Sequence, residues 1–225
     1  MDRILTYTVT SQEAGMQVLE FLRSKGFSRH ILTSMKPDKE ALLVNGVRIG
    51  GRDTLHAGDF FRVRVMETGS VDGIVPTPLP LNVLYEDEDI LVLNKPADMP
   101  VHPSIGNYTN TLANAAAFYF QQKDELCPFR CINRLDRDTS GALILAKNAL
   151  SAAILSAQMR NREIRRTYLA VVCGVPPSSG TISAPIGRVS DSVIQRQVDL
   201  EHGESAVTHY ERLAVRNDHS LLEIH

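Results

Sequence analysis

The sequence predicts an α+β protein, in which a mainly antiparallel mixed sheet is flanked by helices and preceded by a small α+β module. Short apolar runs separated by turn signals recur in the second half of the chain, at the spacing of hairpin strands. Long helical patterns interrupt them over 109–122 and 149–163. The composition is ordinary for a globular protein, with 43% hydrophobic and 22% charged residues among 225.

The first 65 residues begin with helical patterns. Val18, Leu19 and Leu22 share one side of a helix that opens at Ser11 or Glu13, and Gly26 ends it. A second helical stretch is expected near residues 28–35.

Strand signals follow within the same module. Asn45-Gly46 lies between two apolar runs and favours a tight hairpin turn, because both residues accept positive φ angles. A second turn over 55–59 leads into 60–65, where apolar residues alternate with arginines. Such alternation predicts one face on a core and one charged face.

A domain boundary is expected over residues 66–81. Pro76, Pro78 and Pro80 stand at alternate positions, preceded by two glycines, and favour an extended backbone. The sequence therefore predicts a module at 1–65, a linker at 66–81 and a larger domain at 82–225. The strands expected in the larger domain are 83–85, 90–93, 142–146, 167–172, 193–200, 206–213 and 220–224.

Composition restricts the class of protein. No apolar run is long enough to cross a bilayer, and the start of the chain lacks a signal peptide pattern. Three cysteines are too few for a disulfide framework, and their spacing does not fit zinc. We therefore expect a cytoplasmic protein with no membrane partner and no bound metal.

Charge is distributed unevenly along the chain. The whole chain carries −2, but residues 1–65 hold 10 Lys and Arg against 7 Asp and Glu, whereas the remainder holds 14 against 19. A local positive field attracts a polyanion even on a near-neutral protein. The arginine cluster at 160–166 is also typical of a solvated helix end.

The most polar loop of the sequence, at residues 131–141, precedes an apolar strand. Asp136 and Asp138 fit the start of a calcium loop, but Lys147 stands where a glutamate ligand is needed, so calcium is rejected. Two interpretations stay open from spacing alone: a functional loop, or a structural one whose aspartates cap turns and pair with Arg134 and Arg137. The acidic run 86–89 predicts a turn between strands.

The segment Ile132-Asn133-Arg134-Leu135-Asp136-Arg137-Asp138-Thr139-Ser140-Gly141 resembles the signature loop of RluA/RluD-type RNA pseudouridine synthases. That signature is His-Arg-Leu-Asp, two variable residues and Thr-Ser-Gly. Further blocks resemble the family in the same order, at 90–96 with 101–103, 166–170 with Gly174, and 206–210. Residues 1–65 resemble an RNA-binding module shared with a small-subunit ribosomal protein.

Two positions depart from the family pattern. Asn133 stands where many members have histidine, and this difference does not remove the aspartate of the signature. The family continues beyond the strand at 220–224 into a Gly-Arg-Thr-His-Gln block, whose arginine pairs with the catalytic aspartate. The resemblance therefore implies that this chain is a C-terminally truncated version of a longer enzyme, and whether such a chain is active stays open.

The resemblance implies isomerisation of uridine to pseudouridine in RNA without a cofactor. It assigns the carboxylate role to Asp136, a wedge in the RNA stack to Arg134, and stacking on uracil to Tyr168. Whether Asp136 attacks the sugar, attacks the ring or abstracts a sugar proton stays open.

The resemblance also implies an RNA partner. Phosphate contacts are expected from Arg29, Lys36, Arg48 and Arg52. Large-subunit ribosomal RNA is the preferred substrate, with transfer RNA second, and we expect a monomer. The alternative function is a non-catalytic RNA-binding or ribosome-assembly protein; a structural domain with no RNA partner is disfavoured by the basic module.

Overall fold

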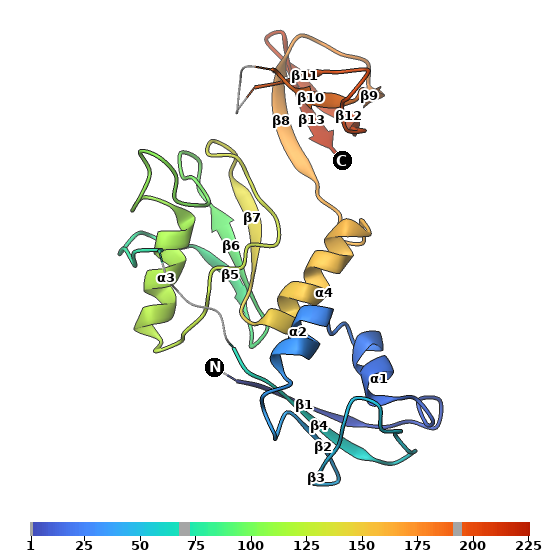
Figure 1. Ribbon diagram of the computed structural model, residues 1–225. Helices are drawn as coiled ribbons and strands as arrows, with labels where there is room; N and C mark the ends of the chain where they lie inside the picture. Colours follow the sequence, from blue (N-terminus) through green and yellow to red (C-terminus); the bar gives the residue numbers. More distant parts are fainter. Residues whose placement is uncertain (1, 68–72, 191–194) are drawn as a thin grey trace. The chain divides into compact units, whose positions relative to one another are not determined.

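The computed structural model describes residues 2–67, 73–190 and 195–225 (Figure 1). The backbone forms two compact units, one reaching to Glu163 and the other covering Ile164–His225. The named strands pair antiparallel throughout, which confirms the predicted fold class. Among the helices of these ranges, none has the length and apolar character to cross a membrane.

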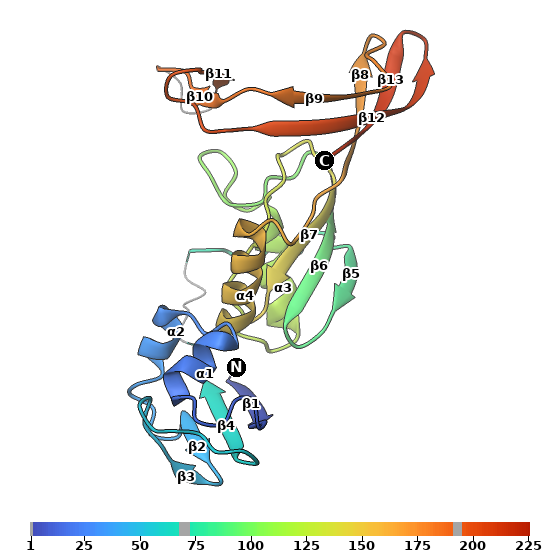
Figure 2. The same cartoon turned by 90° about the vertical axis from the view of Figure 1, so that its right-hand side faces the viewer.

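The first unit opens with a four-stranded sheet of order β1-β4-β2-β3. Its helices, α1 and α2, lie on one face of this sheet (Figure 2). The elements are β1 (Arg3–Thr8), α1 (Val18–Ser24), α2 (Arg29–Ser34), β2 (Leu42–Val44), β3 (Val47–Arg48) and β4 (Phe60–Val65). The predicted hairpin is confirmed, because Asn45 and Gly46 have φ values of 50° and 83° between β2 and β3.

The start of α1 differs from the prediction. Residues 11–15 form turns, and the helix begins only at Val18. The Glu13 carboxylate accepts hydrogen bonds from the backbone amide and hydroxyl of Thr10, and Gly15 has a φ of 88°. These local bonds and the left-handed residue interrupt the helical path that the apolar spacing suggests.

The core of this N-terminal sheet includes a helix from much later in the chain. Leu150, on α4 (Ala149–Arg160), belongs to the same buried cluster as Phe21, Leu22 and Phe61. A Cβ added to Gly26 would lie 2.5 Å from Ile154 of α4. The first 65 residues therefore share their core with a helix of the following segment.

A three-stranded sheet of order β5-β6-β7 follows. Its strands are β5 (Val83–Glu86), β6 (Ile90–Lys95) and β7 (Gly141–Ala146), and they confirm three predicted strands. Helix α3 (Leu112–Gln122) packs on one face through Leu112, Ala116 and Phe120, against Leu91, Leu93, Leu143 and Leu145. Part of the predicted linker, residues 68–72, lies outside the described residues.

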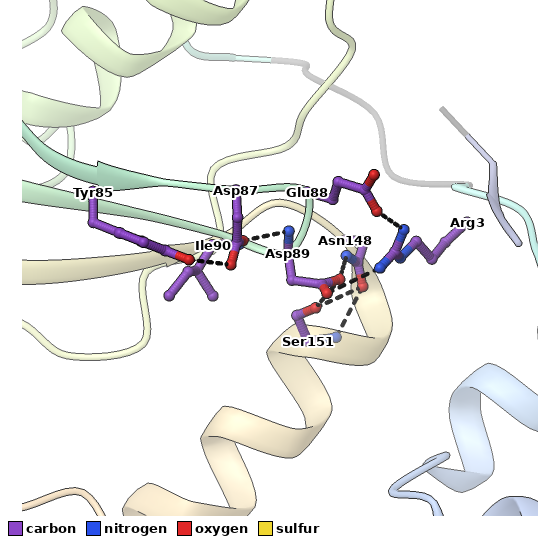
Figure 3. A network of polar contacts seen from close by, with 8 residues as sticks. All are labelled: Arg3, Tyr85, Asp87, Glu88, Asp89, Ile90, Asn148 and Ser151. Carbon is purple, nitrogen blue, oxygen red and sulfur yellow. Dashed lines mark hydrogen bonds and ion pairs between the residues drawn. The ribbon is translucent and has the colours of Figure 1, made fainter. Parts of the chain in front are cut away.

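The turn predicted at the acidic run is confirmed over residues 87–89, and it also joins distant segments (Figure 3). Asp89 accepts hydrogen bonds from Asn148 at 2.8 Å and Ser151 at 3.0 Å, at the start of α4. Arg3 of β1 pairs with Asp89 at 3.0 Å and also with Glu88. The turn thus links β1 to the N-terminus of α4.

Glu86, at the end of β5, joins the strands to α3. Its carboxylate accepts hydrogen bonds from Lys123 at 2.6 Å, from Lys147 at 2.7 Å and from Tyr119. Burial would raise the pKa of Glu86, but these three donors outweigh burial and lower the pKa to about 2. Only the ionised form is therefore well accommodated in the folded chain.

Replacement of Glu86 by glutamine is expected to remove part of the acid sensitivity of folding. Because the folded-state pKa lies below the ordinary 4.5, the stabilisation is complete above about pH 4.5 and is lost as the pH falls toward 2. The ionised Glu86 carboxylate thus contributes roughly 3 kcal/mol to the free energy of unfolding, and this contribution is measured by urea unfolding across this pH range. Glu20→Gln, at an exposed position, is the matched control, and an identical pH slope in both variants would contradict this assignment.

The second unit contains a four-stranded sheet of order β8-β13-β12-β9 and a two-stranded sheet of β10 and β11. Three predicted strands are confirmed as β8, β12 and β13, whereas β9 and β10 were not predicted. Residues 193 and 194 of the predicted strand 193–200 lie outside the described residues, and residues 196–198 of it form β11. The elements are β8 (Tyr168–Cys173), β9 (Ser179–Ser183), β10 (Ile186–Arg188), β11 (Arg196–Val198), β12 (Val207–Arg216) and β13 (His219–Ile224).

Candidate active site

The loop predicted to carry function begins alongside β7. The Ile132 amide donates to the Ile144 carbonyl at 2.9 Å. The Asn133 side chain donates to the Ala142 carbonyl at 3.1 Å and accepts from the Ile144 amide at 2.9 Å. Asn133 thus fixes the first half of the loop to the strand, which is a positioning role and requires no ionisable group.

Asp136 lies at the far end of this loop, with an exposed side chain. Its neighbour Leu135 is buried, and the Thr139 amide donates to the Asp136 carbonyl at 3.1 Å, closing a turn. Gly141 then enters β7 with a φ of 125°, a conformation that favours glycine. The backbone is therefore held on both sides of a carboxylate that is accessible to solvent.

Lys95, at the end of β6, is completely buried beneath the loop. Its Nζ donates to the carbonyls of Pro96, Met99 and Arg137, each at 2.8 Å. Burial lowers the pKa of Lys95, and the charges of Asp138 and Asp136 oppose that shift. The three donors of one ammonium group are thus used to join the segment after β6 to the Asp136 loop.

Sequence reasoning did not find this role of Lys95. The available signal was a lysine at the end of an apolar strand, directly before proline, in a block that resembles the family. A lysine is rarely buried unless its charge is compensated, so its environment became evident only from the folded backbone.

Arg137 does not pair with an aspartate of its own loop, as the structural interpretation of the loop expected; its partner is Asp98. Its Nε donates to Asp98 Oδ1 at 2.7 Å, and both side chains are exposed. The Met99 amide also donates to the Arg137 carbonyl at 3.2 Å. Arg137 therefore strengthens the connection between the two loops and leaves the Asp136 carboxylate free for another partner.

Arg134 is exposed, and its side chain forms no hydrogen bond or ion pair with a described residue. The pairing with Asp138 that spacing allowed is not formed. Burial lowers the pKa of nearby His102, and the charge of Arg134 lowers it further. The His102 ring meets Phe129 edge-on with centroids 5.1 Å apart. An unpaired guanidinium beside a neutral imidazole is available to contact RNA.

The thiols near the site are poor nucleophiles. Burial raises the pKa of Cys131 to about 12 and that of Cys127 to about 11. Both groups are therefore protonated at neutral pH, and the thiolate is the reactive form. Within 2–67, 73–190 and 195–225, no cluster of three or more His, Cys, Asp or Glu side chains is arranged to hold a metal ion.

Tyr168 is the first residue of β8, where it is half-buried and pairs with Ile224 of β13. Asp136 and Arg134 share one loop of the first unit, whereas Tyr168 belongs to the second unit. The structure thus brings Arg134 and Asp136 together, and stacking of Tyr168 on a base stays a prediction.

The four basic residues predicted to contact phosphate are all exposed. Arg29 begins α2, and Lys36 follows that helix. Arg48 ends β3, and Arg52 lies in the turn after it. Lys36, Arg48 and Arg52 line one pocket, whereas Arg29 does not.

Comparisons with known proteins identify the family of this chain. A family model described as RNA pseudouridylate synthase matches residues 89–225. The Bacillus subtilis protein named "Uncharacterized RNA pseudouridine synthase YjbO" is 36% identical over 196 residues, which cover 87% of this chain and 69% of that protein. "Ribosomal large subunit pseudouridine synthase D" of Xanthomonas campestris pv. campestris is 38% identical over 198 residues, covering 88% and 59%.

A solved structure supports the fold. "Human RNA Pseudouridylate Synthase Domain Containing 1" is 27% identical with a TM-score of 0.53, covering 71% of this chain and 61% of that one. The chain spans 59% of the length of two synthases named for the large ribosomal subunit, from Xylella fastidiosa and Xanthomonas campestris. The resemblance of the signature loop to RluA/RluD-type enzymes is confirmed, and the chain belongs to the RNA pseudouridylate synthase family.

Proposed function

We propose that the protein converts uridine to pseudouridine in RNA. The observation that carries the proposal is the exposed Asp136 carboxylate, on a loop fixed to β7 by Asn133 and to β6 by Lys95. A reactive group must be held accurately, and this loop is supported on both sides by partly buried hydrogen bonds.

The reaction breaks the bond between the ribose and a uracil nitrogen and forms a bond from the same sugar carbon to uracil carbon 5. The hydrogen on carbon 5 leaves as a proton, and the released nitrogen takes up a proton, so the atoms balance without a redox partner. Asp136 supplies the carboxylate at the sugar–base junction. Arg134 occupies the gap in the stack that the displaced base leaves, and Tyr168 stacks on the uracil.

The proposed substrate is large-subunit ribosomal RNA, which two of the relatives carry in their names, with transfer RNA second. The N-terminal module (1–65) adds phosphate contacts through Arg29, Lys36, Arg48 and Arg52, and the linker (66–81) leads into the catalytic domain (82–225). The enzyme acts as a monomer in the cytoplasm and requires no cofactor.

The proposal is tested by nucleoside chromatography of digested RNA after incubation with the full chain. Ribosomal RNA transcripts that lack modification should gain a pseudouridine peak at the expense of uridine. RNA that is bound by the chain but gains no pseudouridine would instead support a non-catalytic RNA-binding protein.

Arg134→Ala is expected to reduce turnover by roughly 10²-fold while weakening binding to single-stranded RNA only about twofold. The reason is that the guanidinium acts when the base is displaced, whereas overall affinity comes from many phosphate contacts. Single-turnover rates and RNA titrations measure the two effects separately. Arg23→Ala removes an exposed arginine elsewhere and is the matched control. Equal losses of rate and affinity in Arg134→Ala would contradict the wedge role.

A further inference from the structure

A pocket of about 410 Å³ opens in the N-terminal module. It lies between the segment that follows α2 and the turn that follows β3. Its apolar lining includes Leu19, Met35, Leu42 and Ile49, whereas its charged lining includes Lys36, Lys39, Arg48 and Arg52. The volume falls within the range of small-ligand sites in proteins.

The four cations of this pocket have no partner among the residues that the structure describes. Among the described residues, Lys36, Lys39, Arg48 and Arg52 form no side-chain hydrogen bond or ion pair. By contrast, Lys25 pairs with Glu13 at 2.7 Å in the same module. The positive charge at the pocket is therefore uncompensated and available to an anion.

Asp38 is the carboxylate in the pocket lining, and it is already engaged. Arg64 donates to both of its oxygens, from Nε at 2.8 Å and from Nη2 at 2.6 Å. The Arg64 hydrogen bond lowers the pKa of Asp38, so the carboxylate stays ionised and bound to Arg64. It does not neutralise the lysines and arginines around it.

The combination of features selects a ligand with two chemical parts. A surface that binds only phosphates needs cations but no apolar hollow, whereas a purely apolar ligand does not need four cations. A nucleotide has both a flat base with an apolar face and an anionic phosphate. Single-stranded RNA exposes such bases, and proteins recognise them in pockets.

We propose that this pocket receives one unstacked nucleotide of the bound RNA, with its base on the apolar lining and its phosphate at the cations. The proposal rests on the proposed function, since it takes RNA as the substrate. It assigns the N-terminal module a base-binding role in addition to phosphate contact. It also adds Lys39 to the RNA-contacting residues, whereas the phosphate contact of Arg29 lies outside this pocket.

Photochemical cross-linking tests where the base lies. The full chain carrying Asp136→Asn is mixed with a single-stranded RNA that contains 4-thiouridine, irradiated, digested and analysed by mass spectrometry. Cross-links are expected in the peptide segments 32–42 and 48–52. Cross-links confined to other segments would overturn the proposal.

Two substitutions test the two halves of the pocket in RNA titrations at several salt concentrations. Arg52→Gln should weaken binding about fivefold or more and reduce the salt slope by about one. Ile49→Ser changes no charge and should weaken binding about fivefold while leaving the salt slope unchanged. Arg23→Gln, which removes an exposed arginine outside the pocket, should have less than about a twofold effect. Thermal unfolding verifies that each variant is folded.

The pocket would be overturned if Arg52→Gln and Arg23→Gln weakened RNA binding equally and Ile49→Ser did not weaken it. That result would indicate a diffuse basic surface. Pseudouridine formation by the wild-type chain in that case would leave the proposed function intact. A wild-type chain that neither binds RNA nor forms pseudouridine would refute both.

Discussion

Asp136→Asn is expected to abolish pseudouridine formation, with a loss of roughly 10³-fold or more in single-turnover rate. The amide keeps the size of the side chain but can act neither as a nucleophile nor as a base. Because Asp136 is exposed and its loop is held by Lys95, Asn133 and the Leu135 side chain, the substitution should leave the fold unchanged. RNA affinity should change less than about twofold, since the loss of one negative charge does not weaken binding to a polyanion.

Asp138→Asn is the matched control for this variant. Asp138 is also exposed, lies two residues later in the same loop, and carries the same charge. It should retain most of the wild-type rate. A rate for Asp136→Asn that equals the rate for Asp138→Asn would contradict a catalytic role for Asp136.

Lys95→Met is expected to reduce both stability and turnover. The substitution removes the Nζ donor from three partly buried carbonyls, of which the Arg137 carbonyl keeps the Met99 amide as a donor, at a cost of roughly 3 kcal/mol. Turnover should fall by roughly 10²-fold even in the folded fraction, because the Asp136 loop loses its connection to β6. Urea unfolding and single-turnover kinetics below the unfolding transition measure the two effects.

The pH dependence of turnover distinguishes a role at the site from a purely structural one. Asp138 and Asp136 lie close enough to Lys95 for their charges to raise its pKa against the effect of burial, which favours the ammonium form of Lys95. In Lys95→Met this charge is absent at every pH, so the shape of the pH–rate profile should differ from that of the wild-type chain. Arg137→Ala removes only the exposed pair with Asp98 and should cost less than about 1 kcal/mol with an unchanged profile. A wild-type rate and profile in Lys95→Met would contradict the positioning role.

The parts of the fold that depend on local chemistry were predictable from the sequence. Asn45-Gly46 specifies its own backbone conformation, and the acidic run 86–89 contains the side chain that caps its turn, since Asp87 accepts from the amides of Asp89 and Ile90. Strand β1 was not predicted, although Leu5 pairs with Val63 of β4, because its partner lies far away in the sequence. Packing of Leu150 into the N-terminal core is likewise a long-range contact that no local pattern indicates.

The candidate site was predictable to a similar degree. The signature loop identified Asp136 and Arg134, and the structure places both on one exposed loop. Lys95 was missed because its importance depends on three carbonyls from two segments, and neither segment suggests a ligand for an ammonium group on its own. The shared pocket of Lys36, Arg48 and Arg52 depends in the same way on how α2 and the hairpin fold together.

Release of a hydrogen label from uracil carbon 5 tests the central claim most directly. The full chain and its Asp136→Asn variant are incubated side by side with ribosomal RNA that carries tritium at that carbon. Our account predicts label release into water by the wild-type chain, in proportion to the pseudouridine formed, and none above background by the variant. Equal release by both proteins would contradict the account.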